Sequence, residues 1–342
     1  MTDAVLAAFA KQIGWCERLG SPFTARLLAL LADDISRGGP AAALAGDWPG
    51  DPIADALPLR FAGALHALVL AGAAPDLAAC YPPHATEPAW PALRDVLATR
   101  AAEIRQILAS PPQTNEVGRS AVLLGGFLAV AATTALPLRL LEIGASAGLN
   151  LVWDRYRYRL GTAAWGDPAS PLLLAPEWQG DLPPLAAPVQ VAERAACDVA
   201  PIDLADPAQR LRLRAYVWAD QRERLARLDA AIAIARAAGH RVDRADAADW
   251  LRARLAVPAE GRATVLYHSI MWQYMPAATR AAIAAEIDEA GARATPAAPF
   301  AWLRFEPPSA EAAPELALTL WPGGEPQRLA VAHAHGSKVA WL

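Results

Sequence analysis

Cysteine is scarce in this sequence and is not arranged for cross-linking or for binding metal. The 342 residues contain three, Cys16, Cys80 and Cys197, which lie far apart and form no Cys-x-x-Cys pair. Neither a disulfide framework nor a zinc site is therefore indicated. Disulfides are typical of oxidising compartments, so this use of cysteine fits a reducing environment, and we expect a cytoplasmic protein.

Charged residues are also few. Only 19% of the residues are charged, the formal net charge is −4, and no long run of Lys and Arg is present. Binding to phosphates needs clustered basic side chains, so we expect no nucleic-acid partner. A hydrophobic content of 54% instead predicts a large core, organised as one large domain or two.

Targeting segments are not evident. Asp3 stands near the start and no basic stretch precedes the first apolar residues, so the N-terminus does not resemble a secretory signal. Positions 120–138 carry no charge and approach the length of a membrane span. They contain as many Ala as Leu, five of each, and are interrupted by Gly125, Gly126 and Pro137. We therefore predict a helix buried against a sheet and no membrane partner.

Two parts of the chain differ in their hydrophobic pattern. Residues 1–110 place apolar residues at helical spacing, for example Val5, Phe9 and Ile13, and show no strand-like alternation. We therefore predict an N-terminal helical domain over this range. In residues 111–342 strand and helix patterns alternate, which predicts an α/β domain with a mostly parallel sheet and helices on both faces.

Two features modify the predicted α/β domain. Residues 161–188 are rich in proline, and such an excursion within a compact α/β domain is often a lid or a binding loop. Near the C-terminus, two strand patterns flank Pro322-Gly323-Gly324-Glu325. This arrangement predicts a terminal antiparallel hairpin at the edge of the parallel sheet.

The stretch 138–153 organises the α/β domain. An apolar strand pattern ends at Ile143, Gly144-Ala145-Ser146-Ala147-Gly148 forms a tight turn, and a helix pattern follows. Such a turn presents backbone N–H groups and a helix N-terminus to a ligand. Ser146 stands where a dinucleotide fingerprint needs its second glycine, which disfavours that motif. The turn matches the Gly-x-Ser-x-Gly of serine hydrolases, and also an acid-x-Gly-x-x-x-Gly pattern that begins at Glu142.

The acid-glycine pattern resembles the first motif of S-adenosylmethionine-dependent methyltransferases. The whole chain is similar to a bacterial family of uncharacterised proteins with a methyltransferase-like fold. The motifs that carry this similarity are Asn115-Glu116-Val117-Gly118-Arg119, the turn above, Trp165-Gly166-Asp167-Pro168, Cys197-Asp198, Asp220-Gln221, His268-Ser269, Trp272-Gln273-Tyr274 and Trp321-Pro322-Gly323-Gly324-Glu325. The resemblance implies a Rossmann-like, methyltransferase-type domain with S-adenosylmethionine as cofactor and a small molecule as substrate.

The resemblance also implies which residues contact the cofactor. The turn would curl under its methionine end, with the acid orienting the amino group; the residues concerned are Glu142, Gly144, Ala145, Ser146, Gly148 and Asn150. An acid after the next strand would bind the ribose, and Asp198 and Asp220 are both candidates. Asp246, with Ala247 after it, would bind the adenine amine. Asp246 is equally well explained as the N-cap of a helix.

Residues on the acceptor side follow the strand pattern 263–268. His268 and Tyr274 are the predicted catalytic residues, because a histidine at such a strand end can accept a proton from the attacking group. The predicted substrate contacts are Asn115, Glu116, Arg119, Trp165, Trp272 and Gln273. The alternatives are structural roles: His268 would be a buried histidine of the core, and residues 115–119 would be a capped helix start. His333 and His335 share a strand face but have no third ligand, so we expect no metal.

Three functions remain open on the sequence alone. The first is a methyltransferase that uses S-adenosylmethionine. The second is a serine hydrolase with Ser146 as nucleophile, a downstream acid such as Asp246, and His333 or His335 as base. The helical pattern before the turn argues against this, because hydrolases place several strands and an oxyanion-hole loop there. The third is a non-catalytic protein that keeps the nucleotide-binding fold as a scaffold.

Overall fold

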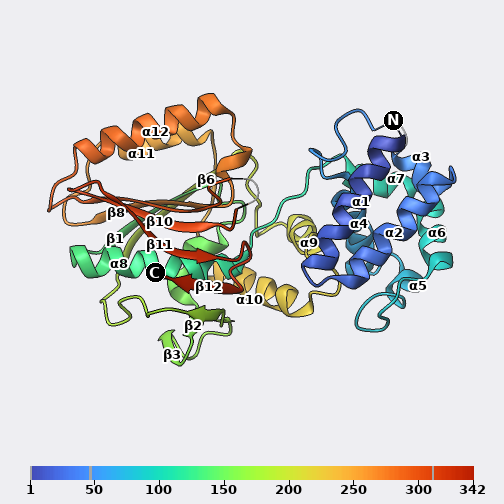
Figure 1. Cartoon of the computed structure of the whole chain (residues 1–342), viewed down its shortest axis with the longest axis horizontal. Coiled ribbons are helices and arrows are strands. Elements are labelled where there is room, and N and C mark those ends of the chain that lie inside the picture. Colours follow the sequence, from blue (N-terminus) through green and yellow to red (C-terminus); the bar gives the residue numbers. More distant parts are fainter. Residues whose placement is uncertain (1, 46–47, 310–311) are drawn as a thin grey trace. The chain divides into compact units, whose positions relative to one another are not determined.

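The computed structural model describes residues 2–45, 48–309 and 312–342. The chain forms two compact units, which Figure 1 shows in ribbon form. We call Met1–Thr114 with Asp206–Ala226 the helical unit, and Asn115–Ala205 with Arg227–Leu342 the α/β unit. The helical unit therefore takes a second, later segment of the chain in addition to the N-terminal region.

The helical unit is built around α4, which is buried along most of its length and packs against α1, α2, α7 and α9. The apolar residues of α1 at helical spacing, such as Val5 and Phe9, face this core. The second segment joins it because Gly63 of α4 lies against the Tyr216 ring, where a Cβ would come within 2.6 Å. The helices are α1 (Thr2–Arg18), α2 (Pro22–Ser36), α3 (Pro40–Ala45), α4 (Leu57–Leu70), α5 (Pro75–Ala78), α6 (Trp90–Thr99), α7 (Ala101–Leu108) and α9 (Pro207–Ala215), with α10 (Arg222–Ala238) beginning in this unit.

The α/β unit contains the main sheet, whose described strands are ordered β5-β12-β11-β10-β9-β8-β1-β6-β7. Strands β7, β6, β1, β8 and β9 are parallel, and β10, β11 and β12 continue the sheet in antiparallel fashion. The predicted α/β class, mostly parallel and with an antiparallel hairpin near the C-terminus, is confirmed. The strands are β1 (Leu138–Ile143), β5 (Glu177–Gln179), β6 (Val191–Asp198), β7 (Asp243–Arg244), β8 (Ala263–Ser269), β9 (Phe300–Glu306), β10 (Glu315–Trp321), β11 (Pro326–Ala332) and β12 (Lys338–Trp341).

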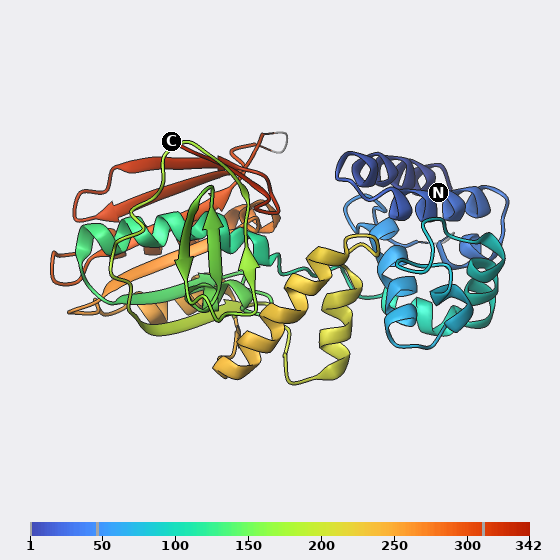
Figure 2. The same ribbon diagram turned by 90° about the horizontal axis from the view of Figure 1, so that it is seen from below.

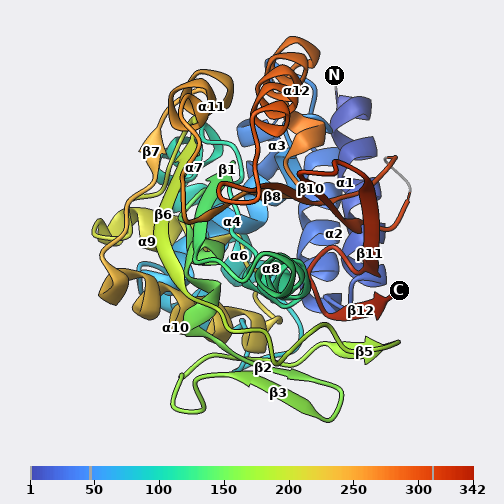
Figure 3. The ribbon, with the colours of Figure 1, turned by 90° about the vertical axis from the view of Figure 1, so that its left-hand side faces the viewer.

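Helices cover both faces of the main sheet. Figures 1 and 3 show α11 (Ala247–Leu255) and α12 (Ala277–Ala292) on one face and α8 (Ser120–Thr134) on the other. Two adjacent glycines let α8 approach the sheet closely, because a Cβ on Gly125 would meet Trp341 and one on Gly126 would meet Leu303. In the described part of the chain, Val117–Thr134 is the one helix apolar and long enough to span a membrane, and 72% of it is buried in the protein.

The proline-rich segment 161–188 packs on the α8 side of the sheet. Its strands β3 (Ala163–Gly166) and β4 (Leu173–Leu174) flank β2 (Arg157–Leu160) in a small separate sheet, and β5 pairs with β12. Figure 2 views this small sheet from outside, with α8 behind it. Trp165 of β3 stacks on Trp153 at 5.5 Å between ring centroids. This position differs from that of a lid over the ends of the parallel strands.

Candidate functional site

The candidate site lies at the carboxyl ends of the parallel strands, where the strand order reverses. The chain passes from β1 outward to β6 and β7, and then returns to the other side of β1 to form β8 and β9. Connections that leave neighbouring strands in opposite directions open a crevice at this edge. The turn after β1 and the turn after β8 both lie at this edge of the sheet, and both carry predicted site residues.

The turn after β1 has an unusual backbone. Gly144, Ser146 and Gly148 adopt φ values of 65°, 54° and 69°. Glycine tolerates this left-handed conformation, whereas for Ser146 it is uncommon and costs free energy. The Asp198 carboxylate at the end of β6 stabilises the turn by accepting hydrogen bonds from the backbone N–H of Ser146 and of Ala200, each at 2.8 Å. Asp198 therefore lies at the predicted turn.

The Ser146 hydroxyl is buried without a partner. The residue is 5% exposed, and its Oγ has no hydrogen-bond partner among the described residues. A buried unpaired hydroxyl is costly, which marks it as a group whose partner is supplied from elsewhere. A hydrolase would need a histidine within hydrogen-bond reach of this oxygen, and no described histidine is. His333 instead contacts His335 and the Ser337 hydroxyl in the turn before β12.

Glu142 is a buried acid beside this turn. The side chain is 3% exposed and its Oε2 accepts a hydrogen bond of 3.1 Å from the Tyr267 hydroxyl of β8. Burial raises the pKa of the Glu142 carboxyl to about 8, helped by the charge of Asp198 and opposed by the Tyr267 hydrogen bond and by Arg119. The carboxyl is therefore mostly protonated at neutral pH and would gain from a cationic partner.

Side chains cover the outer surface of the turn. The half-buried Met271 side chain lies against Gly144, where a Cβ would come within 2.4 Å of its terminal methyl carbon. His240 lies in the same way against Gly148, at 2.8 Å from the position of a Cβ. Burial lowers the pKa of His240, so its ring is neutral at physiological pH. A ligand that reaches the glycines must displace the Met271 side chain, which is unbranched and flexible.

The segment before α8 is tied to the same edge by hydrogen bonds. Asn115 Oδ1 accepts from the Leu149 N–H at 2.9 Å, and Glu116 caps the 3-10 turn η1 (Val117–Arg119) through the Gly118 N–H. Arg119 donates to the carbonyl oxygens of Ser269 and Ala334, at 3.0 and 3.1 Å. These three predicted substrate residues thus border the site, and the bonds found for them are structural.

Asn150 belongs to the same network. It is 1% exposed, its Oδ1 accepts from the Ser120 hydroxyl at 2.7 Å, and its amide donates to the Glu116 carbonyl at 3.4 Å. The side chain therefore joins η2 (Leu149–Arg155), which follows the turn, to the start of α8. Ala145 is fully buried beneath the turn and its N–H donates to the Cys197 carbonyl. Both residues hold the turn in place.

His268 is a structural residue and not an available base. It is 1% exposed, its Nδ1 lies 2.7 Å from Glu306 Oε1, and its Nε2 accepts from the Trp302 indole N–H at 3.1 Å. The Glu306 carboxylate also accepts from the Met271 N–H at 3.0 Å. Because both ring nitrogens have protein partners, His268 has no free lone pair for a substrate proton. The alternative of a buried structural histidine describes it better, with side-chain partners in place of backbone.

The loop after β8 carries the exposed part of the site. Ile270 has a φ of 50°, which is strained for a β-branched residue. Trp272 stacks on His268 at 5.0 Å between ring centroids, and Gln273 and Tyr274 follow it on the turn η3 (Trp272–Tyr274). Tyr274 is 76% exposed. These side chains are accessible to a substrate, whereas Trp165 is on the α8 side of the sheet with the small sheet.

Two predicted acids have helix-capping roles. Asp246 precedes α11 and accepts a hydrogen bond of 2.9 Å from the Ala248 N–H, with Ala247 buried behind it. The carboxylate is at the end of β7 and stays exposed. Asp220, the second candidate for the ribose acid, does not follow a strand of the main sheet, because residues 214–220 are the end of α9 and a turn of the helical unit. Asp220 there accepts from Ser21 Oγ and from the Phe23 N–H, which caps α2.

Several residues of this edge had no sequence prediction. Tyr267, Met271, Glu306 and His240 contact the predicted residues, as described above. Glu306 is the last residue of β9 and Glu142 the last but one of β1, so an acid near the end of an apolar strand pattern was a usable signal. Across residues 2–45, 48–309 and 312–342, no group of three His, Cys, Asp or Glu side chains is placed to hold a metal ion.

Fold and site together define an α/β protein in which strained turns and buried polar groups meet at the carboxyl edge of a parallel sheet. The chain belongs to the family described as "Uncharacterized protein conserved in bacteria (DUF2332)", whose model matches residues 6–341. No curated protein and no solved structure matches the chain. The resemblance to a bacterial uncharacterised family is thereby confirmed.

Proposed function

We propose that the α/β unit binds S-adenosylmethionine at the carboxyl ends of β1, β6 and β8 and methylates a small molecule. The observation that carries this proposal is a buried acid, Glu142, directly before a left-handed glycine turn at the point where the strand order reverses. In chain order the parallel strands run 3-2-1-4-5, the order of Rossmann-type sheets, which bind nucleotides at this point.

The residues at the turn suit such a cofactor. Glu142, whose carboxyl is mostly neutral in the free protein, would ionise beside the amino group of the methionine moiety. The buried Ser146 hydroxyl, which has no partner, would gain one. Asp246, exposed at the end of β7, keeps one carboxylate oxygen for the adenine amine while it caps α11. Bound there, S-adenosylmethionine would supply an electrophilic methyl group.

Positioning carries the catalysis in this proposal. His268 is held by Glu306 and Trp302, so its role is to orient the loop that follows β8. Trp272, Gln273 and Tyr274 on that loop would hold the acceptor against the cofactor. Orientation of two reactants alone supplies a large part of a rate enhancement. The acceptor proton would leave to solvent.

Binding is the first test, with the full chain and calorimetry. We expect micromolar affinity for S-adenosylmethionine and for S-adenosylhomocysteine, and no binding by Gly144→Arg. The matched control is Gly261→Arg, because Gly261 also has a positive φ, 72°, and nothing lies within 4 Å of its Cβ position. Should Gly144→Arg fail to fold, Glu142→Gln replaces it and should bind S-adenosylmethionine more weakly than the wild type, while its amide oxygen still accepts a hydrogen bond from Tyr267.

Two results would overturn the proposal. One is a folded wild-type protein that binds neither nucleoside at millimolar concentration. The other is Gly144→Arg that melts like Gly261→Arg and still binds as the wild type does. A fluorophosphonate that labels the wild type and not Ser146→Ala would support the hydrolase instead. A folded protein that neither binds the nucleosides nor reacts with the fluorophosphonate would support the third hypothesis, a non-catalytic scaffold.

A further inference from the structure

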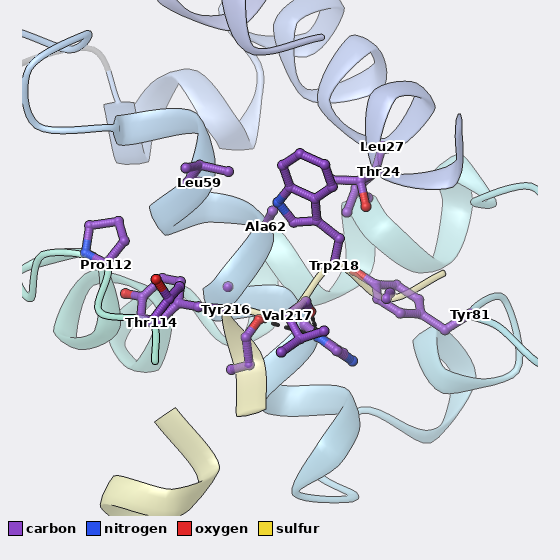
Figure 4. Close-up of a pocket in the computed structure, with 14 residues that line it drawn as sticks. Thr24, Leu27, Leu59, Ala62, Tyr81, Pro112, Thr114, Tyr216, Val217 and Trp218 are labelled. Atoms are coloured by element: carbon purple, nitrogen blue, oxygen red, sulfur yellow. Dashed lines mark hydrogen bonds between the residues drawn. The ribbon is translucent and has the colours of Figure 1, made fainter. Parts of the chain in front are cut away.

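The helical unit contains a pocket that is separate from the proposed cofactor site. About 390 Å³ of space between atoms, part of it open to solvent, lies among its lining residues, all of which belong to this unit. Figure 4 shows Trp218 and Tyr216 from the second segment facing Leu27, Tyr81 and Pro112 from the first. The pocket is thus lined by both of the chain segments that make up the unit.

Tyr81 brings an unsatisfied hydroxyl to this pocket. The residue is 1% exposed, and its hydroxyl has no hydrogen-bond partner among the described residues. In Figure 4 the hydroxyl end of the Tyr81 side chain points toward Trp218. A buried phenol normally finds a partner, because an unpaired one costs its full desolvation energy. The Tyr81 hydroxyl is therefore a hydrogen-bond donor that a ligand in the pocket could satisfy.

His66 brings a complementary acceptor. Its Nδ1 lies 2.9 Å from the Val217 carbonyl oxygen and 3.2 Å from that of Ala215, and two acceptors at one nitrogen require the proton there. Nε2 then carries a lone pair, and no described donor reaches it. Burial lowers the pKa of His66, which keeps the ring neutral. The rings of His66 and Tyr81 stack with centroids 6.1 Å apart. One ligand could therefore contact both His66 Nε2 and the Tyr81 hydroxyl.

The lining carries no charge. The residues that form it include no Asp, Glu, Lys or Arg, and most are aliphatic or aromatic. A small number of polar groups on an apolar wall is the usual construction of a small-molecule site. A charged ligand would lose its hydration here without a counter-charge, so the lining selects against it.

We propose that this pocket of the helical unit binds a neutral, planar heteroaromatic molecule that carries a hydrogen-bond acceptor next to a donor. The acceptor pairs with the Tyr81 hydroxyl, the donor with His66 Nε2, and the ring lies between Trp218 and the aliphatic wall. The site is independent of the cofactor site proposed for the α/β unit. It would give the protein a second ligand with a separate chemistry.

The probes are three small rings, tested on the full chain by saturation-transfer NMR and titration. We expect 2-pyridone, a neutral ring with adjacent donor and acceptor, to bind with a dissociation constant on the order of 1 mM or lower. Toluene, without hydrogen-bonding groups, and benzoate, an anion, should bind at least about tenfold more weakly. Equal binding of toluene or benzoate, or no binding of 2-pyridone, would contradict the proposal; the last result would mean that the pocket holds only water.

Two tyrosine variants form the matched pair. Tyr81→Phe removes an unpaired hydroxyl, so 2-pyridone should bind about tenfold more weakly while the melting temperature stays equal or rises. Tyr158→Phe removes a hydroxyl that donates to the Trp153 carbonyl at 2.7 Å in the α/β unit, so the melting temperature should fall and binding stay unchanged. Unchanged binding by Tyr81→Phe, or a melting temperature that falls as far as that of Tyr158→Phe, overturns the assignment.

Discussion

The helical unit and the α/β unit treat buried polar side chains differently. In the helical unit they mostly fix the backbone of another segment: Arg60 donates to the Leu108 carbonyl and Asp34 accepts from the Ala41 N–H, each at 2.7 Å. In the α/β unit one group of them lies at one edge of the sheet, where Glu142, Ser146 and His268 are at or just beyond the ends of two neighbouring strands; Arg139 and Thr264 are buried near the opposite ends of these strands. The first pattern stabilises a fold, and the second concentrates chemical groups in one place.

Backbone strain follows the same division. Of the three non-glycine residues described with positive φ in the α/β unit, Ser146 and Ile270 lie in the loops that follow β1 and β8, and Ala135 is the C-cap of α8. In the helical unit the non-glycine residue with this conformation in the described ranges is Ala56, just before α4. Strained backbone conformations cost stability, and they are found mainly at functional sites, where the surrounding structure maintains them. The comparison therefore favours the edge of the α/β unit as the functional site.

Removal of a core aromatic from each unit gives the largest expected effect. Trp153 is fully buried between Phe127 and Trp165, and Phe61 is fully buried against Phe9. Trp153→Ala and Phe61→Ala should each lower the free energy of unfolding by about 3–5 kcal/mol, each in its own unit, because the cavities lie in separate cores.

Urea unfolding followed by hydrogen exchange reports the two units separately. Trp153→Ala should reduce protection in the strands of the main sheet and leave α4 unchanged, and Phe61→Ala should do the reverse. Equal loss of protection in both units for either variant would show one cooperative core, and the contrast between the units would fail.

The pH dependence of stability gives the next largest effect. The pKa of Glu142 is raised from 4.5 to about 8, so the folded protein holds a proton that the unfolded chain releases above pH 4.5. Its contribution to stability is full below pH 4.5 and is lost progressively up to about pH 8. Over this window the wild type should lose about 2–4 kcal/mol relative to Glu142→Gln.

Chemical denaturation of both proteins at several pH values measures this difference. The comparison with Glu142→Gln cancels the other titrating groups, because the two proteins differ only at this carboxyl. A difference that is flat with pH, or one that grows in favour of the wild type as pH rises, would mean that Glu142 is ionised in the folded protein.

Removal of a helix cap gives the smallest expected effect on stability. Each unit contains an equivalent Asp cap, so the two can be compared directly. Asp206 caps α9 through the Ala208 N–H at 2.8 Å, as Asp246 caps α11 through Ala248. Asp206→Ala and Asp246→Ala should each cost about 1 kcal/mol in thermal unfolding. Asp206→Asn and Asp246→Asn should both keep the helix caps. Only Asp246→Asn should lower the affinity for S-adenosylmethionine. Equal affinity of the two Asn variants would reduce Asp246 to a cap.

The sequence predicted those parts of the fold that depend on local pattern. The apolar run before Gly144 became β1, the run at 263–268 became β8, and the turn at Pro322-Gly323-Gly324-Glu325 joins β10 to β11. Short buried strands and glycine turns are recognisable because burial and left-handed backbone each restrict the residue types allowed.

Contacts between residues far apart in the chain could not be predicted from the local sequence pattern. Asp220 was predicted after a strand, whereas it caps α2 from 199 positions away, and Ser21 makes no side-chain cap of its own. His268 was predicted to be catalytic, with a buried structural histidine as the alternative, and Glu306 and Trp302 of the neighbouring strand occupy both of its nitrogens. Each outcome depends on which segments pack together, and the spacing of residues along the chain does not encode that directly.

The most direct test of the cofactor proposal is the number of protons released on binding. S-adenosylmethionine is titrated into the full chain at pH 7 by calorimetry in two buffers with different ionisation enthalpies. If its amino group pairs with the Glu142 carboxyl, binding should release more than about half a proton, and Glu142→Gln should release none. Binding without proton release, or release that persists in Glu142→Gln, would contradict the assignment.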